Sequence, residues 1–285
     1  MARVELAPWT GRCATRDEVD AARTPLPRVI RSDMMRTMSR RVGLEDVWRS
    51  AVHLQELVPD AVLVGGAAAA HHAHHRESFV HDHVLTDLAE RYAEVVEAVE
   101  ASEGWVTSVR ASSPPLTLLG SLDGIEAGLR QLRRVRPLEV ETVDVEGRSL
   151  RVPTLPECLR VKAYLIVQRN QVRDYLDTVA LADRLGGAEA VSTLVGIDDY
   201  YRDRSELSDS VLTGVLQRLA EPSPRDTRVI RQLRAYKGLA QRWQEWASVV
   251  VACADLADAV LEHLAHLEHL EHLEHLQHLA HLEQR

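Results

Sequence analysis

The sequence predicts an α+β fold, in which a mixed sheet with helices is followed by a helical C-terminal half. Short apolar segments typical of strands occur at 61–64, 105–110, 116–120, 138–145 and 149–152. From Thr154 onward the apolar residues recur only at helical spacing. We therefore expect four parts: a loose extension over 1–42, an α/β domain over 43–154, a helical domain over 155–250 and a helical tail over 251–285.

The first half begins with a helix and a short strand. Apolar residues recur at helical spacing from Gly43, and Pro59 with Asp60 ends that helix. The strand at 61–64 then runs directly into Gly65 and Gly66, which open an alanine-rich helix. Backbone amides at such a junction can approach phosphate oxygens, although two glycines after a strand are more often a simple turn.

The remaining elements follow from local signals. We expect a polar crossing over 71–82, a helix capped by Thr86, and a hairpin that turns at Glu146 and Gly147. Thr154 and Glu157 match a capping box at the start of the next helix. Further helices are predicted from Asn170 or Gln171 to 186–187, over 206–220 and over 226–247.

Composition limits the possible functions. The formal net charge of -9 argues against a protein that coats nucleic acid along its whole surface. The three cysteines are far apart, so a disulfide framework is not expected. No apolar stretch is long enough to span a membrane, and we expect a soluble cytoplasmic protein without a membrane partner.

Two groups of residues carry the chemical signal. The first is Gly65-Gly66-Ala67 followed by Arg76, Ser78, Val80 and Asp82. The second, in the helical half, is Lys162, Arg169, Arg173, Asp174 and Asp177. In this order, they resemble the motifs of bacterial AbiEii-type nucleotidyltransferase toxins over roughly residues 60–186. The resemblance implies a nucleotidyltransferase-like fold, a nucleoside triphosphate substrate with Mg²⁺, and transfer to RNA such as tRNA; by analogy, it also implies a cognate antitoxin.

The sequence departs from this family at Val80, where an Asp-x-Asp strand has its first aspartate. Alternate residues of a strand share a face, so two such carboxylates hold metal together, and Asp82 alone would hold it poorly. His81 and His83 are expected on the opposite face. Glu139 or Glu141 is the candidate for a third carboxylate, and two surface glutamates are an equally good interpretation.

The helical motif predicts cations for the phosphates. On a continuous helix Lys162, Arg169 and Arg173 would share one stripe, whereas a break near Asn170 would blur it. Lys162 could contact a phosphate, and either arginine could grip one bidentately. Asp174 and Asp177 could orient these cations or act as bases toward an acceptor hydroxyl. The alternative is a solvated, salt-bridged helix.

Histidines are dense in two places. His71, His72, His74, His75, His81 and His83 suggest zinc only weakly, because no glutamate or cysteine accompanies them at ligand spacing, and a polar helix end or a cleft lining is preferred. The tail repeats His-Leu in steps of three, so its leucines spiral around a helix and form no coiled-coil seam. We interpret it as a repeat expansion whose leucines could promote self-association.

Three hypotheses follow. The first is a nucleotidyltransferase that transfers a nucleotide to RNA or another hydroxyl. The second is a catalytically impaired module of the same fold that binds a nucleotide or a partner, which Val80 favours. The third is a helical interaction protein whose motif matches are accidental.

Overall fold

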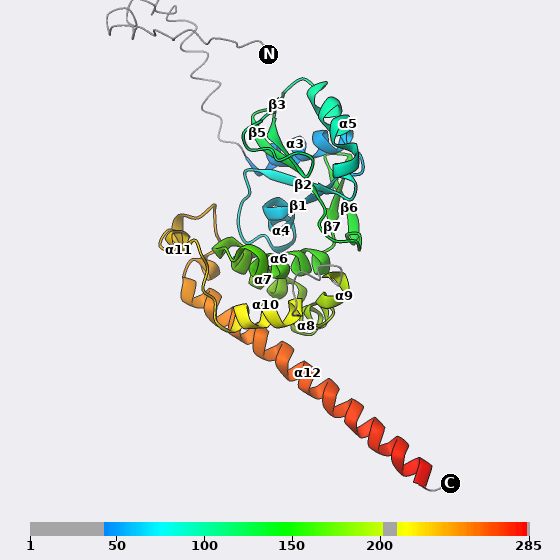
Figure 1. The fold of residues 1–285 in the computed structure, drawn as a ribbon. Coiled ribbons are helices and arrows are strands. Elements are labelled where there is room, and N and C mark those ends of the chain that lie inside the picture. Colours follow the sequence, from blue (N-terminus) through cyan, green and yellow to red (C-terminus); the bar gives the residue numbers. More distant parts are fainter. Residues whose placement is uncertain (1–42, 202–209, 284–285) are drawn as a thin grey trace, which may run out of the picture. The chain divides into compact units, whose positions relative to one another are not determined.

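The computed structural model describes residues 43–201 and 210–283, so the predicted extension over 1–42 lies outside the described residues. A 5-stranded sheet has the order β1-β2-β5-β4-β3 (Figure 1). Its strands are β1 Val62–Val64, β2 His81–Leu85, β3 Trp105–Thr107, β4 Thr117–Leu122 and β5 Ile125–Gln131. Only β2 and β5 pair in parallel within this sheet, with Asp82 opposite Gly128 and Val84 opposite Arg130. The predicted mixed sheet is confirmed.

One face of the sheet is covered by α3 Leu44–Leu57 and α5 Leu88–Glu100. Leu54 and Val95 from these helices pack with Leu85 and Leu129 of the strands. The hairpin of β6 Val140–Val145 and β7 Arg148–Pro153 forms a separate pair that turns at Glu146 and Gly147, as predicted. The opposite face of β2 and β5 is not covered by these two helices and lies toward the site.

The helix α4, Gly65–Ala73, lies between the sheet and the helices that follow (Figure 1). Its alanines make this possible, because Ala68 and Ala69 are fully buried and let α4 approach α7 closely. The helix therefore extends into the segment that we expected to be a polar crossing.

The helical half contains α6 Leu155–Arg169, α7 Val172–Leu185, α8 Gly187–Val195, α9 Ile197–Tyr201 and α10 Val211–Ala220. Thr154 caps α6 as predicted, since its side chain accepts a hydrogen bond from the Glu157 amide. The reciprocal half of the capping box is absent from this helix start. Glu157 is instead fully buried, and its carboxylate accepts hydrogen bonds from Arg134 and Arg160. Tertiary pairing has displaced a local contact.

Two other predictions were wrong, and the central strand β5 was not predicted. The cap of α5 is Asp87 rather than Thr86, without a side-chain capping bond. The helix expected over 226–247 is instead α11 Thr227–Ile230, then 3-10 turns η1 Leu233–Ala235 and η2 Gln241–Trp243. That difference shapes the site.

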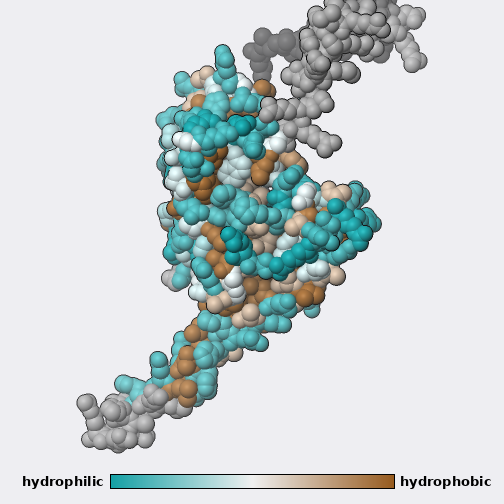
Figure 2. Space-filling model, turned by 180° about the vertical axis from the view of Figure 1, so that it is seen from behind, coloured by the Kyte–Doolittle hydropathy of each residue, from teal (hydrophilic) through white to brown (hydrophobic). Residues whose placement is uncertain are grey.

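The helix α12, Trp246–Glu283, is packed at its start and exposed farther along. Val249, Cys253 and Val260 are buried, whereas Leu267 and Leu273 are exposed. Figure 2 shows apolar side chains scattered among polar ones along this projecting helix. None of the described helices has the length and apolar character needed to cross a membrane.

Candidate anion-binding pocket

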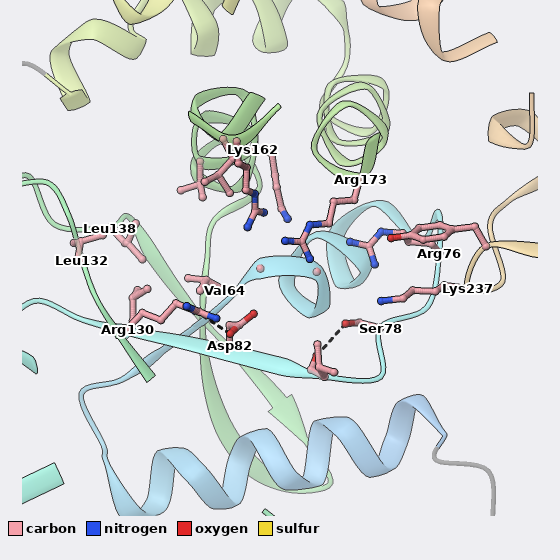
Figure 3. Close-up of a pocket in the computed structure, with 18 residues that line it drawn as sticks. Val64, Arg76, Ser78, Asp82, Arg130, Leu132, Leu138, Lys162, Arg173 and Lys237 are labelled. Atoms are coloured by element: carbon pink, nitrogen blue, oxygen red, sulfur yellow. Dashed lines mark hydrogen bonds and ion pairs between the residues drawn. The ribbon is translucent and has the colours of Figure 1, made fainter. Parts of the chain in front are cut away.

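A pocket of about 210 Å³ lies among the N-terminus of α4, the face of β2 and β5, and the helices α6 and α7 (Figure 3). It brings together residues from both predicted motifs: Gly65, Gly66, Arg76, Ser78, Val80, Asp82, Lys162, Arg169 and Arg173. Four cationic side chains, Arg76, Lys162, Arg173 and Lys237, point toward one space in the pocket (Figure 3). The pocket is therefore strongly basic.

The two glycines have distinct steric roles at the start of α4. Gly65 has a φ of 76°, a left-handed conformation that glycine adopts without strain. A Cβ on Gly66 would lie 2.8 Å from the Arg76 guanidinium, so the missing side chain admits that cation. Ala67 is buried and does not line the pocket. Its side chain therefore cannot make the contact with a cofactor that we expected. Ser78 closes the following turn by donating to the Val80 carbonyl at 2.9 Å.

The strand β2 separates two chemical environments by alternation. Asp82 lines the pocket, while His81 and His83 on the opposite face are buried, as predicted. Ser50 Oγ lies 2.9 Å from His81 Nε2. Burial lowers the pKa of His81 to about 4, and it also holds the pKa of His83 well below its ordinary value. Both rings are neutral at pH 7.

Asp177 does not line the pocket but holds its cations from behind. Its fully buried carboxylate accepts two hydrogen bonds from Arg76, at 2.7 and 2.8 Å. It also lies 2.7 Å from Lys162 Nζ and 2.7 Å from His75 Nε2. Burial alone would raise the pKa of this carboxyl, but Arg76 and Lys162 outweigh burial and hold the pKa well below its ordinary value. The Asp177 carboxylate is therefore enclosed by cations of the pocket and is not open to the pocket itself.

Asp174, one turn before Asp177 on α7, also pairs with a cation of the pocket. Its buried carboxylate accepts hydrogen bonds from Arg169 Nε at 2.9 Å and Nη2 at 2.7 Å. It does not line the pocket, and of our two hypotheses only the orientation of a cation agrees with this geometry. The single stripe predicted for Lys162, Arg169 and Arg173 is interrupted, because Asn170 adopts a φ of 52° between α6 and α7. All three side chains nevertheless reach the pocket.

Lys237 completes the pocket from a segment that sequence reasoning had placed in a helix. Its carbonyl accepts a hydrogen bond from the Glu77 amide at 2.7 Å, and the Ala240 amide donates to the His75 carbonyl at 2.8 Å. These bonds fasten the segment beside Arg76. Burial lowers the pKa of Lys237, and Arg76 and Arg173 lower it further. Gly238 was the one local signal that could have revealed the turn.

Glu139 and Glu141 are not brought to Asp82. Glu139 binds Arg160 and Tyr200, and Glu141 lies 3.7 Å from His72, so neither lines the pocket. The expected third carboxylate is wrong for this reason. The clustered histidines also lie elsewhere, because none of His71, His72, His74, His75, His81 and His83 lines the pocket.

The donor set does not fit Mg²⁺. Asp82 is the only carboxylate among the lining residues, and its Oδ1 lies 3.2 Å from Arg130 Nε. Val80 offers no side-chain oxygen, and magnesium in proteins is usually held through carboxylates and phosphates. Within residues 43–201 and 210–283, no cluster of three or more His, Cys, Asp or Glu side chains could hold a metal ion.

Comparison with known proteins gives partial matches. No family model matches the chain. A segment of 95 residues is 38% identical to the heme uptake protein MmpL11 of Mycobacterium tuberculosis, covering 33% of this chain and 10% of that protein. A segment of 109 residues is 36% identical to the mycolic acid-containing lipids exporter MmpL11 of Mycolicibacterium smegmatis, covering 37% and 11%. The chain thus spans about a tenth of the length of these curated relatives.

Solved structures with a similar arrangement include a nucleotidyltransferase toxin, an antibiotic-resistance factor and a nucleotidyltransferase-like protein. MenT4, a nucleotidyltransferase toxin of Mycobacterium tuberculosis, is 15% identical with a TM-score of 0.45, over 76% of this chain and 82% of that one. The antibiotic-resistance factor ANT(2'')-Ia is 11% identical with a TM-score of 0.42, over 57% and 95%. An antigenic nucleotidyltransferase-like protein of Paracoccidioides brasiliensis is 15% identical with a TM-score of 0.35, over 66% and 96%.

Proposed function

We propose that this chain is a nucleotidyltransferase-like protein whose basic pocket binds the polyphosphate of a nucleoside triphosphate. The observation that carries the proposal is the convergence of Arg76, Arg173 and Lys237 on the N-terminus of α4 (Figure 3). A helix N-terminus is itself electropositive, so cations gathered there repel one another and the helix end. A multiply charged anion removes that repulsion and accepts the free amide hydrogens.

The cations differ in how far they are already neutralised. Arg76 and Lys162 share Asp177, and Arg169 is held by Asp174. Arg173 and Lys237 have no acidic partner among the described residues. These last two supply uncompensated charge, while the paired cations supply fixed hydrogen-bond donors. Such a division suits a ligand that carries several negative charges.

An adjoining cavity can hold the rest of the nucleotide. It has a volume of about 500 Å³ and shares Arg130, Leu132 and Leu138 with the phosphate pocket. Its lining combines apolar side chains, amides such as Gln131 and Gln168, and five arginines, of which Arg133 and Arg134 do not line the first pocket. Apolar side chains together with hydrogen-bonding groups fit a nucleobase and ribose. We place the nucleoside part of the ligand in this cavity.

Nucleotide binding tests the proposal directly. The affinity for a fluorescent N-methylanthraniloyl-ATP is expected to fall about tenfold in each of two single variants, Arg173→Gln and Lys237→Gln. The reason is that each charge-assisted contact contributes roughly 1.5–3 kcal/mol. The matched control is Arg184→Gln, an exposed arginine of α7 that does not line the pocket. Equal affinities for all four proteins would contradict the assignment of the pocket.

Nucleotide transfer is a second candidate function, favoured by the presence of Asp82 and Lys162 in the same pocket. In that reaction an acceptor hydroxyl of RNA such as tRNA, or of another molecule, would attack the α-phosphorus, and pyrophosphate would leave. MenT4 is described as a toxin, and an antitoxin partner for this chain belongs to the same proposal. Incubation of the protein and of Val80→Asp with labelled triphosphates, magnesium and RNA distinguishes the candidates. Transfer only by Val80→Asp would establish a binding module that has lost turnover.

A further inference from the structure

A cationic side chain of the pocket lies beside its single carboxylate, at the place where that carboxylate would hold a metal ion. Arg130 Nε lies 3.2 Å from Asp82 Oδ1, and both side chains are partly exposed to the pocket. We infer that the Arg130 guanidinium takes the place of a divalent cation, so that the polyphosphate binds without magnesium. This inference rests on the proposed binding function and concerns the same site.

The sheet register produces this contact. β2 and β5 are parallel, with Asp82 opposite Gly128 and Val84 opposite Arg130, so these residues lie on one face. A Cβ on Gly128 would lie only 2.6 Å from Asp82 Oδ1. The missing side chain therefore lets the carboxylate lie against β5, within reach of the guanidinium two residues farther along. The pairing is a consequence of backbone position as well as charge.

The surrounding charges oppose a divalent ion. Such an ion would have to displace Arg130 from Asp82, and Val80 provides no second carboxylate to compensate. It would also stand near Arg169, Arg173 and Lys237, which line the same pocket. Like charges at such short range repel, and a partly buried pocket screens them less than water does. Phosphate oxygens can instead accept hydrogen bonds from the remaining N–H groups of the guanidinium.

Binding measurements with and without magnesium test the inference. The probe is N-methylanthraniloyl-ATP, titrated with the full chain in magnesium chloride and in EDTA. We expect the unaltered protein to bind as tightly in EDTA as in magnesium. Arg130→Gln should weaken binding in EDTA about tenfold, and Arg130→Lys should keep most of the affinity because the charge remains. The matched control, Arg184→Gln, removes an exposed arginine that lines neither the pocket nor the adjoining cavity and should leave the affinity unchanged.

A double variant gives the converse result. Arg130→Gln with Val80→Asp restores two carboxylates on one strand face, and its binding should become dependent on magnesium. Loss of binding by the unaltered protein in EDTA, or full affinity of Arg130→Gln in EDTA, would overturn the inference and leave nucleotide binding intact. Absence of binding by the unaltered protein in both buffers would overturn the proposed function as well. Circular dichroism checks that each variant is folded, as expected for a half-exposed Arg130 side chain.

Discussion

Two carboxylates near the pocket lie in opposite environments. Asp177 is fully buried in the helical half and is surrounded by His75, Arg76 and Lys162. Asp82, on the sheet, is partly exposed and contacts Arg130 at 3.2 Å. The buried carboxylate pairs with cations of the pocket from behind, whereas the partly exposed one lines the pocket itself. The two sequence motifs contain one of these residues each. Only the surroundings in the fold distinguish the buried carboxylate from the one that lines the pocket.

Removing the buried charge should give the largest effect. Asp177→Asn leaves Arg76 and Lys162 buried without an anionic partner, and such a change costs about 3–5 kcal/mol of the free energy of unfolding. Urea denaturation followed by circular dichroism measures it. The control is Asp183→Asn on the same helix, whose ion pair with Arg242 is exposed and should contribute less than about 1 kcal/mol. Equal stability of the two variants would mean that Asp177 is not the anchor of the site.

The neutral histidines behind Asp82 should make stability depend on pH. Above pH 6.5 the folded and unfolded states both carry neutral His81, but below it only the unfolded state takes up a proton, since the folded pKa is about 4. The free energy of unfolding is therefore expected to fall between pH 6.5 and 4, by on the order of 3 kcal/mol from this residue.

Denaturation at a series of pH values tests this expectation. His81→Gln should have a flatter profile than the unaltered protein, while His53→Gln, a more exposed histidine, should not. A profile that begins to fall only where carboxylates titrate would show that the buried histidines are not responsible.

The smallest effect is expected at the exposed carboxylate. Asp82→Asn removes one negative charge from the pocket and frees Arg130 for phosphate, so triphosphate affinity should rise a few-fold. Stability should change by less than about 1 kcal/mol, because the ion pair is partly exposed. Fluorescence titration measures the affinity. A large loss of binding would instead assign Asp82 a direct role in holding the ligand.

Local signals were enough to predict one wall of the pocket. Three features depend on near neighbours in sequence: the strand that leads into Gly65, the alternation of His81, Asp82 and His83, and the cap at Thr154. The order of the cationic residues in the helical half was also informative. The roles of Asp174 and Asp177 were not, because burial decides them and a sequence pattern does not report burial.

Two missing pieces have physical explanations. β5 was not predicted although Ile125, Ala127 and Leu129 alternate with Glu126, Gly128 and Arg130, because alanine and glycine have low strand propensity; pairing on both edges stabilises the strand instead. Lys237 was not predicted because the apolar spacing of 226–247 resembles a helix. Backbone hydrogen bonds to distant residues near Arg76 determine its conformation instead. Tertiary contacts override local preference in both places.

The fastening of the Lys237 segment to residues 75–77 also affects when the pocket can form. The sheet and α4 are synthesised long before Lys237, and the backbone bonds that seat this wall join residues far apart in the chain. Contacts of large sequence separation are costly in loop-closure entropy and tend to form late. A nascent chain that has not yet emerged past Ala240 would therefore carry the N-terminus of α4 without Lys237 beside it. The pocket should accordingly become complete only after residues 237–240 have been synthesised and have reached residues 75–77.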